Sequence, residues 1–446
     1  MTLNRAAGCI RNLNEHARCS GFGLKSECRR AVRTKPEPPA RTFRDGRANL
    51  NDVDVEGLRN SPIGRLEPIS GTDPRTGDDW RYWAYVPKPL PSSPDLLPAT
   101  HQIATAAAMQ LARLDQAMTQ LPRPELLVRP ILRREAVATS ALEGTYATFD
   151  EVLEAEFLAE NQQSQEQREV INYIRATELA LERSEKYPIC RTLLGPVQKE
   201  IVRNTPDDSG EAGDLRQHQV AIGPKNRPIS EARLVPSPPG PILVDGFSDW
   251  EKWVNDNTLP LSPVIKIAMG HYQFETLHPY NNGNGRLGRL IMVLQLIADN
   301  IMTKPVLNLA RWLEERKDDY IAGLLKVSHT GDFNPWVSFI SEGVKIQAEN
   351  GVKTINDLLA LKSSYSARLR EAGARGAAME VADILIGFPI IDVSTAAKLI
   401  DRPFETANQA ISKLVTLGVL REITGRRTHR LFLCADVLRI ANGAAH

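Results

Sequence analysis

The chain has 446 residues, of which 42% are hydrophobic and 24% are charged, and its net charge is +1. This composition fits a globular protein of about three domains, and it gives no overall attraction to nucleic acids or membranes. The longest apolar run, at 290–298, is far shorter than the ~20 residues of a membrane span, and the five cysteines show neither metal-ligand nor disulfide spacing. We therefore expect a cytoplasmic protein that does not contact the membrane.

Residues 1–77 are rich in arginine, poor in apolar residues, and end in closely spaced glycines and prolines. This composition predicts a basic leader that is disordered or loosely tethered. A nucleic-acid-binding arm or a targeting peptide is the alternative. Against targeting, the segment has no apolar h-region and carries several glutamates.

Residues 78–160 are expected to form an N-terminal helical region. After a Pro- and Ser-rich linker at 87–98, apolar residues at helical spacing predict helices at 100–118 and 131–142. Gly144 stands where a left-handed C-terminal cap would end the second helix. Glu143 then falls in the last turn, where the helix dipole disfavours a carboxylate by ~0.3–1 kcal/mol unless a cation neutralises it. We expect a cationic partner for Glu143; an exposed glutamate without a partner is the alternative.

The next segment contains helices and then the best β-candidates of the chain. Helical periodicity marks 166–184 and 193–202, and the glycines of 210–214 interrupt it. Short β-runs at 219–222 and 232–235, separated by a Gly- and Pro-containing turn at 223–228, predict a hairpin. A proline cluster at 236–241 ends the hairpin, and a helix is predicted from 247 to 253.

The most distinctive stretch is 278–289, with the sequence His-Pro-Tyr-Asn-Asn-Gly-Asn-Gly-Arg-Leu-Gly-Arg. Apolar residues at 287, 290, 291, 294 and 297 predict a helix with one buried face directly behind the turn. Its first free N–H groups would belong to residues 283–286, where glycines let an anion approach and the helix dipole favours it. Arg286 and Arg289 add guanidinium groups suited to phosphate. His278 is a candidate proton acceptor near neutral pH.

Two simpler interpretations of this stretch are weaker. Asn282-Gly283 and Asn284-Gly285 are hairpin-turn dipeptides, but neither flank alternates with a period of two. The three glycines at 283, 285 and 288 also match the dinucleotide-binding fingerprint. The residues before them have helical rather than strand spacing, however, and no β-run with a carboxylate follows about 20 residues later.

Further helices are predicted at 308–327 and 334–357, and the pattern changes beyond 372. Helical runs at 394–400 and 404–417, followed by strand-like runs at 421–424 and 431–433, resemble a winged helix-turn-helix module. Its recognition helix offers only Asn408, Gln409 and Lys413, so DNA binding and dimerisation are both open roles. Its wing is basic, as phosphate contact requires, and contains Arg421, Arg426, Arg427 and Arg430.

The stretch 278–289 resembles the signature of the Fic family, His-Pro-Phe-x-(Asp/Glu)-Gly-Asn-Gly-Arg-x-x-Arg. Enzymes of that family typically transfer AMP from ATP to a protein hydroxyl. The resemblance implies that His278 is the base and that Arg286 and Arg289 neutralise the β and γ phosphates. It also implies a nucleotide-binding set that consists of Asn282, Gly283, Asn284, Gly285, Arg286, Leu287, Gly288, Arg289 and Tyr320.

Two positions depart from the family pattern. Tyr280 replaces phenylalanine, and Asn282 replaces the acidic residue of the pattern. That acidic residue resembles the Mg²⁺ ligand of the family, so this chain offers a neutral amide oxygen in place of a carboxylate. Tyr320 matches half of a tyrosine pair that the family often carries near the adenine, because Ile321 follows it. A core aromatic is the alternative for Tyr320.

The run 139–144, Thr-Ser-Ala-Leu-Glu-Gly, resembles the inhibitory motif (Ser/Thr)-x-x-x-Glu-(Gly/Asn) of the same family. The resemblance implies that Glu143 pairs with the second arginine of the signature, Arg289, and leaves the γ phosphate of ATP without its clamp. The hairpin at 219–235 likewise resembles the family flap, which aligns a target segment by adding a strand to its open edge.

We therefore expect a mainly α protein with a Fic helical core at 161–371 that carries a small β-hairpin flap. The inhibitory helix precedes it within 78–160, and a winged helix-turn-helix domain follows at 372–446. The leading hypothesis is a protein adenylyltransferase that uses ATP and Mg²⁺ to modify Ser, Thr or Tyr hydroxyls of a target protein and is inhibited by Glu143. The alternatives are a nucleotide-sensing DNA-binding regulator with a weak Fic core, and a de-AMPylase. A homodimer is a further expectation that the sequence leaves open.

Overall fold

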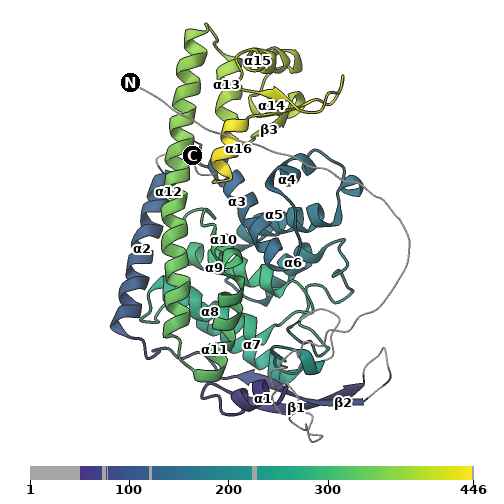
Figure 1. Ribbon diagram of the computed structural model, residues 1–446, viewed down its shortest axis with the longest axis vertical. Coiled ribbons are helices and arrows are strands. Elements are labelled where there is room, and N and C mark those ends of the chain that lie inside the picture. The colour runs from purple at the N-terminus through teal and green to yellow at the C-terminus, as the bar shows by residue number, and fades with distance from the viewer. Residues whose placement is uncertain (1–50, 73–76, 78, 120–122, 224–228, 444–446) are drawn as a thin grey trace, which may run out of the picture. The chain divides into compact units, whose positions relative to one another are not determined.

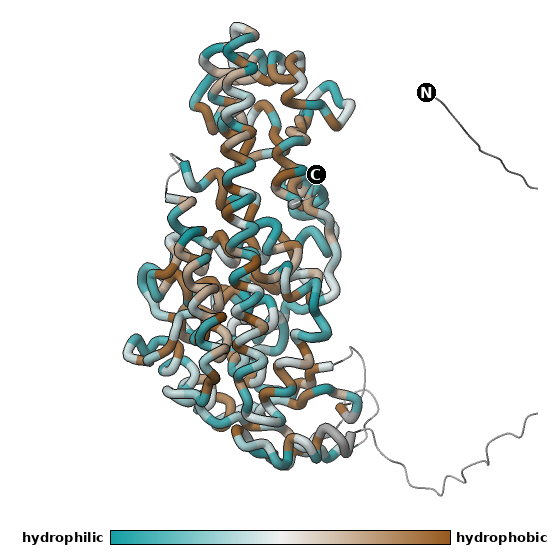
Figure 2. The backbone as a smooth tube through the Cα atoms, turned by 60° about the vertical axis from the view of Figure 1, so that its left-hand side comes forward, coloured by the Kyte–Doolittle hydropathy of each residue, from teal (hydrophilic) through white to brown (hydrophobic). Residues whose placement is uncertain are grey.

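Two long helices lie side by side in the computed structural model, which describes residues 51–72, 77, 79–119, 123–223 and 229–443. They are α2 (Pro98–Thr119) and α12 (Asn334–Glu371) (Figure 1). Hydrophilic and hydrophobic residues alternate along the helices, so one face of each packs into the core (Figure 2). In the described part of the chain, no helix combines the length and the apolar composition needed to cross a bilayer.

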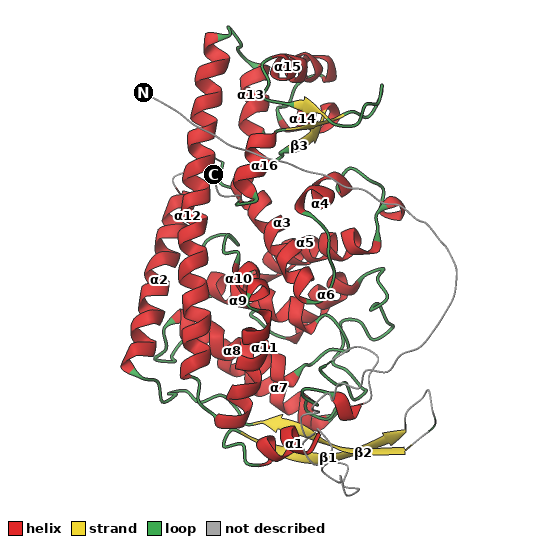
Figure 3. Ribbon diagram, viewed as in Figure 1, coloured by secondary structure: helices red, strands yellow, loops and turns green. Residues whose placement is uncertain are grey.

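The core behind this pair is built around two almost completely buried helices, α8 (Pro263–Leu277) and α9 (Asn284–Ala298). Apolar residues occupy more than one face of both helices, which explains why neighbours surround them. These neighbours are α2, α12, α3 (Glu125–Leu142), α5 (Gln165–Ser184), α6 (Arg191–Val202) and α7 (Pro241–Val254). The mainly helical fold predicted from periodicity is confirmed (Figure 3).

The helix predicted at 308–327 is divided into α10 (Leu309–Glu315) and α11 (Lys317–Thr330). Arg316 separates them with φ −128° and ψ 39°, and its guanidinium lies 3.5 Å from the centroid of the Trp312 ring. The prediction of one helix is wrong because a stacking contact, which leaves no periodic pattern, accompanies the break. The prediction also missed the short helix α4 (Phe149–Ala155), which begins with a capping box of Thr148 and Glu151.

Before α2, the chain forms α1 (Asn51–Arg59) and an antiparallel pair, β1 (Gly64–Thr72) and β2 (Asp79–Pro87). The prediction of a disordered leader is therefore wrong for residues 51–72, while residues 1–50 lie outside the described part. The hairpin was missed because β1 is rich in glycine and proline and its partner strand begins beyond the expected boundary. Gly64 is required at its position, since a Cβ there would lie 2.3 Å from the ring of Tyr85.

The hairpin predicted at 219–235 is reduced, among the described residues, to one antiparallel bridge between Ile222 and Leu234. The Ile222 N–H donates to the Leu234 carbonyl, and the Arg233 N–H donates to the Ile222 carbonyl, both at 2.8 Å. Residues 224–228 of the predicted turn lie outside the described part. The next residue along, Val235, accepts from the Tyr85 N–H of β2 at 2.8 Å, so this segment borders the β1–β2 sheet instead of extending its own hairpin.

Beyond α12, a small three-stranded antiparallel sheet of order β3–β5–β4 packs with short helices. Helices and strands occur where the sequence predicts them beyond residue 390. This part joins the core through α12 and α3: Leu126 of α3 lies against Gly387, and the Arg129 guanidinium lies 4.0 Å from the ring centroid of Phe388. Its elements are α13 (Ala377–Ile384), β3 (Ile390–Asp392), α14 (Val393–Leu399), α15 (Phe404–Thr416), β4 (Arg421–Glu422), β5 (Leu431–Leu433) and α16 (Ala435–Ala441).

Candidate active site

The turn between α8 and α9 is fixed by two left-handed residues and one buried amide. His278 ends α8 with φ 48°, and Gly283 precedes α9 with φ 74°. The Asn284 side chain accepts from the Tyr280 N–H at 2.9 Å and donates to the Tyr280 carbonyl at 2.7 Å. Both hydrogen-bonding groups of this side chain are therefore used to close the turn. Asn284 shapes the site, and only its backbone remains for the predicted contact with a nucleotide.

His278 is half-buried and faces a cavity. Its Nδ1 lies 3.4 Å from the Glu275 carbonyl, a contact that favours a proton on Nδ1 and a free lone pair on Nε2. Burial, helped by the nearby Arg216 charge, lowers the pKa of His278 to about 4. The imidazole is therefore neutral at neutral pH and can accept a proton.

Arg216, which the sequence analysis missed, holds the His278 turn in place. This buried side chain donates to the His278 carbonyl at 2.8 Å and to the His218 carbonyl at 3.1 Å, and it also contacts the Ser237 carbonyl. In addition, the Arg216 N–H donates to the Pro279 carbonyl at 3.0 Å. A lone arginine in a loop has no sequence pattern that would identify this role.

Arg289 and Glu143 form an ion pair, so Glu143 has the cationic partner that we expected for it. The Arg289 Nη2 lies 2.6 Å from the Glu143 Oε1, and Arg289 also donates to the Thr139 hydroxyl at 2.6 Å and to the Thr139 carbonyl at 3.0 Å. The charge of Arg289, opposed by burial, lowers the pKa of Glu143. A Cβ at position 285 would lie 2.2 Å from the Glu143 Oε1, so Gly285 leaves room for the Glu143 carboxylate beside α9.

Arg286 lies on the other side of the turn, paired with two carboxylates that the sequence analysis did not single out. Its Nη1 is 3.5 Å from the Glu169 Oε2, and its Nη2 is 3.5 Å from the Asp207 Oδ2. The Arg286 side chain is only 3% exposed. Both arginines of the signature are therefore engaged by carboxylates of this chain.

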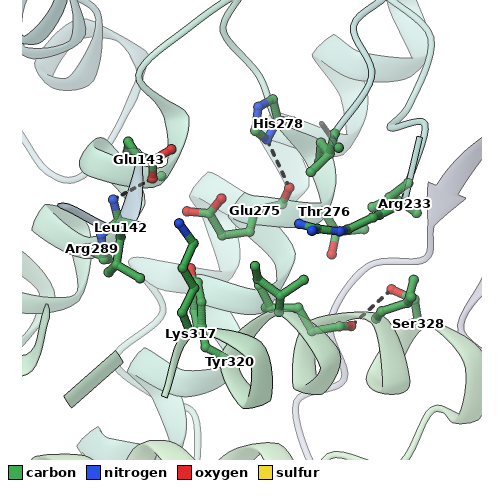
Figure 4. Close-up of a pocket in the computed structure, with 17 residues that line it drawn as sticks. Leu142, Glu143, Arg233, Glu275, Thr276, His278, Arg289, Lys317, Tyr320 and Ser328 are labelled. Carbon is green, nitrogen blue, oxygen red and sulfur yellow. Dashed lines mark hydrogen bonds and ion pairs between the residues drawn. The ribbon is translucent and has the colours of Figure 1, made fainter. Parts of the chain in front are cut away.

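A cavity of about 380 Å³ lies between α3, α8, α9, α11 and the segment around the Ile222–Leu234 bridge. Figure 4 shows its polar side chains converging from these elements. Of the predicted site residues, it brings together His278, Gly285, Arg289, Tyr320 and Glu143. It also contains three ionisable side chains that the prediction missed, Arg233, Glu275 and Lys317.

Tyr320 is both a wall of this cavity and a core aromatic, so the two readings of this residue are not exclusive. Its hydroxyl lies 2.9 Å from the His271 Nε2, and its ring centroid is 5.9 Å from that of Trp336. The side chain is 6% exposed. Tyr320 thus joins the cavity to the packing around α8.

The other residues predicted to bind the nucleotide do not line the cavity: Asn282, Gly283, Asn284, Arg286, Leu287 and Gly288. Leu287 is buried in the core, and its N–H already donates to the Gly283 carbonyl at 3.0 Å. Gly288 packs against Glu275, and Gly283 packs against α6. The Leu287 N–H is therefore used within the helix, and nucleotide contacts by all six residues stay predictions.

The surroundings of Asn282 do not form a metal site by themselves. Its amide nitrogen lies 3.5 Å from the Asp207 carbonyl, and the neighbouring Asp207 carboxylate is already paired with Arg286. The described residues contain no group of three His, Cys, Asp or Glu side chains that could hold a metal ion. One neutral amide oxygen is a weak ligand for Mg²⁺, so these residues do not fit a protein-held magnesium ion.

Two segments of the chain match known protein families. Residues 101–182 match the family model described as Fic/DOC family N-terminal, and residues 188–296 match the Fic/DOC family model. Protein adenylyltransferase fic-1 of Caenorhabditis briggsae is 26% identical over 213 residues, 46% of this chain and 38% of that protein. Protein adenylyltransferase Fic of Aedes aegypti is 32% identical over 140 residues, 30% of this chain and 24% of that protein.

The chain thus spans only about a quarter to two fifths of the length of these relatives. Among solved structures, a Fic family protein from Desulfovibrio desulfuricans G20 matches with a TM-score of 0.50 and 18% identity, over 77% of this chain and 98% of that chain. This likeness concerns the fold. The signature turn lies between α8 and α9, and the two matched segments, 101–182 and 188–296, identify this part of the chain as a Fic/DOC region.

Proposed function

We propose that this protein is an adenylyltransferase that transfers AMP from ATP to a Ser, Thr or Tyr hydroxyl of a target protein. The observation that supports this most directly is a neutral, half-buried His278 in the same cavity as Arg289. A proton acceptor and a phosphate-binding cation on one cavity are the two groups that phosphoryl-type transfer to a hydroxyl needs. The names of the relatives agree with this activity.

In the proposed reaction, the target hydroxyl oxygen attacks the α phosphorus of ATP. A new O–P bond forms, the bond from the α phosphorus to the bridging oxygen of the pyrophosphate breaks, and the hydroxyl proton passes to Nε2 of His278. Arg286 and Arg289 neutralise charge on the departing pyrophosphate. The residues around Asn282 do not fit a protein-held Mg²⁺, so the roles of His278, Arg286 and Arg289 in this reaction do not depend on one.

We further propose that Glu143 keeps the protein inactive. Its carboxylate occupies the Arg289 guanidinium at 2.6 Å, and a γ phosphate needs the same donors. ATP would then bind without its terminal clamp and with its α phosphorus out of line. We also propose that the segment around the Ile222–Leu234 bridge, which lines the same cavity, aligns a target strand.

Label transfer tests the proposal. A protein acceptor incubated with the Glu143→Gly variant should gain label from ATP tagged at the α phosphate and none from ATP tagged at the γ phosphate. His278→Ala in the same background should abolish the transfer. Label from the γ position would identify a kinase instead, and no label from either would refute the transferase.

A second candidate function rests on the C-terminal part. α14, α15 and the β3–β5–β4 sheet follow the order of a winged helix-turn-helix module, and Arg426 and Arg427 are exposed between β4 and β5. Arg430, by contrast, donates a hydrogen bond to the Asn408 side chain at 3.1 Å. Asn408, one of the three polar residues of the presumed recognition helix, is therefore already engaged. If this part binds DNA, the full chain should retain duplex DNA with a steep salt dependence that Arg426→Gln and Arg427→Gln reduce. Salt-independent or absent retention would exclude this role.

A further inference from the structure

Glu275 is a carboxyl group in the cavity that the proposed reaction does not use. It lies in the last turn of α8, three residues before His278, where the helix dipole disfavours a negative charge. Its Oε1 is buried and has no hydrogen-bond partner among the described residues. Figure 4 shows its carboxyl group on the side of the cavity where Glu143, Arg289 and Lys317 lie.

The structure accommodates this carboxyl group closely. A Cβ at position 288 would lie 2.3 Å from the Glu275 Oε1, so Gly288 is the residue that lets the oxygen approach the backbone of α9. The nearest cation on that helix, Arg289, is already committed to Glu143 and Thr139. Glu275 therefore lies beside Arg289, whose hydrogen bonds go to Glu143 and Thr139 instead.

We propose that Glu275 holds a proton and donates it in a hydrogen bond to the terminal phosphate of the bound nucleotide. This inference rests on the proposed function, in which that phosphate takes the place of the Glu143 carboxylate at Arg289. A carboxylic acid has one O–H donor, and a phosphate oxygen is a strong acceptor. An ionised Glu275 at this position would instead repel the phosphate.

The electrostatic surroundings agree with a neutral acid. Burial raises the pKa of Glu275 to about 8, against the lowering effect of Arg289 and with a further rise from Glu143. The other ionisable groups that face it do not carry negative charge near neutral pH, apart from Glu143: burial raises the pKa of Tyr320 and lowers the pKa values of His271 and His278. The charged and titratable groups around Glu275 are Glu143 on α3, His271 and His278 on α8, Arg289 on α9, and Lys317 and Tyr320 on α11.

The proposal predicts how ATP affinity depends on pH once Glu143 is removed. In Glu143→Gly, affinity should fall about tenfold per pH unit above the pKa of Glu275, because ATP binds the protonated form. Loss of Glu143 removes one cause of the raised pKa, so the fall should begin below pH 8. In Glu143→Gly/Glu275→Gln the fall should be absent, since the amide can donate at every pH.

Calorimetry of ATP and ADP between pH 6 and pH 9 provides the test, with Glu143→Gly/Glu182→Gln as the control for an exposed glutamate. ADP, which lacks the γ phosphate, should show the same profile in all three proteins. Superimposable ATP profiles with and without Glu275 would overturn this role alone. No ATP binding by Glu143→Gly would overturn the proposed function together with it.

A second measurement avoids the Glu275 substitution. ATP binding to Glu143→Gly at pH 8, measured in buffers of different ionisation enthalpy, should take up close to one proton per nucleotide. Zero uptake would contradict the proposal even if the Gln variant fails to fold.

Discussion

The Glu143–Arg289 pair gives the sharpest prediction for nucleotide affinity. Replacing Glu143 with glycine frees a guanidinium that is 2% exposed and still positioned by two hydrogen bonds to Thr139. A hydrogen bond between charged groups contributes about 1.5–3 kcal/mol. Because the Glu143 side chain is 41% exposed, solvent screening reduces the contribution of this pair to about 1–2 kcal/mol.

ATP no longer has to displace this pair in Glu143→Gly, so its affinity should rise about 5- to 30-fold. Calorimetry measures the Kd, and label transfer from α-tagged ATP should increase in parallel. Glu380→Gly is the control, because it removes a carboxylate that is 37% exposed, close to the 41% of Glu143, and that pairs with Arg402 at 2.9 Å far along the chain. An ATP affinity within twofold of the parent would refute the reasoning that Glu143 competes with the nucleotide.

Four further outcomes test the site and its support. His278→Ala in the Glu143→Gly background should lower label transfer by about 10²–10⁴-fold while the calorimetric Kd for ATP stays within a few-fold. Asn282→Asp should lower the Mg²⁺ concentration for half-maximal activity by roughly tenfold, since one charge-assisted contact of about 1.5 kcal/mol is added; an unchanged Mg²⁺ titration would show that position 282 does not contact the metal. Burial raises the pKa of Glu135 to about 8 from the ordinary 4.5. Because the unfolded chain loses this proton at lower pH than the folded protein, the folded state loses stability as pH rises from 4.5 to 8. Glu135→Gln should remove that part of the decline in Tm. Gly288→Ala places a Cβ 2.3 Å from the Glu275 Oε1 and should lower the free energy of unfolding by about 1–3 kcal/mol in urea titrations, and no loss would mean that the carboxyl group moves aside.

Local pattern was enough to predict several core helices and the site turn, because the information lies in adjacent residues. The 3.6-residue periodicity located α2, α5, α6 and α9, and the run of small residues after His278 located the start of α9. A cationic partner for Glu143 was also expected, because the helix dipole disfavours a carboxylate at a helix C-terminus, while the choice of Arg289 came from the resemblance to the Fic inhibitory motif.

The elements that could not be predicted depend on contacts between distant residues. β1 acquires its structure from β2 and from the ring of Tyr85, not from its own Gly- and Pro-rich sequence. Arg216 acts through carbonyls more than 20 residues away in the chain. Glu275 looks like an ordinary helical glutamate until the fold places it against Gly288 and removes it from water.

α3 connects two parts of the protein that the sequence separates widely. Its first turns lie against Gly387 and Phe388, and its last turn carries Thr139 and reaches Glu143 beside Arg289. A helix of 18 residues is a stiff rod about 27 Å long. Under the proposed function, a change in how residues 387–388 pack against the first turns of α3 would therefore reach the Glu143–Arg289 pair at its other end.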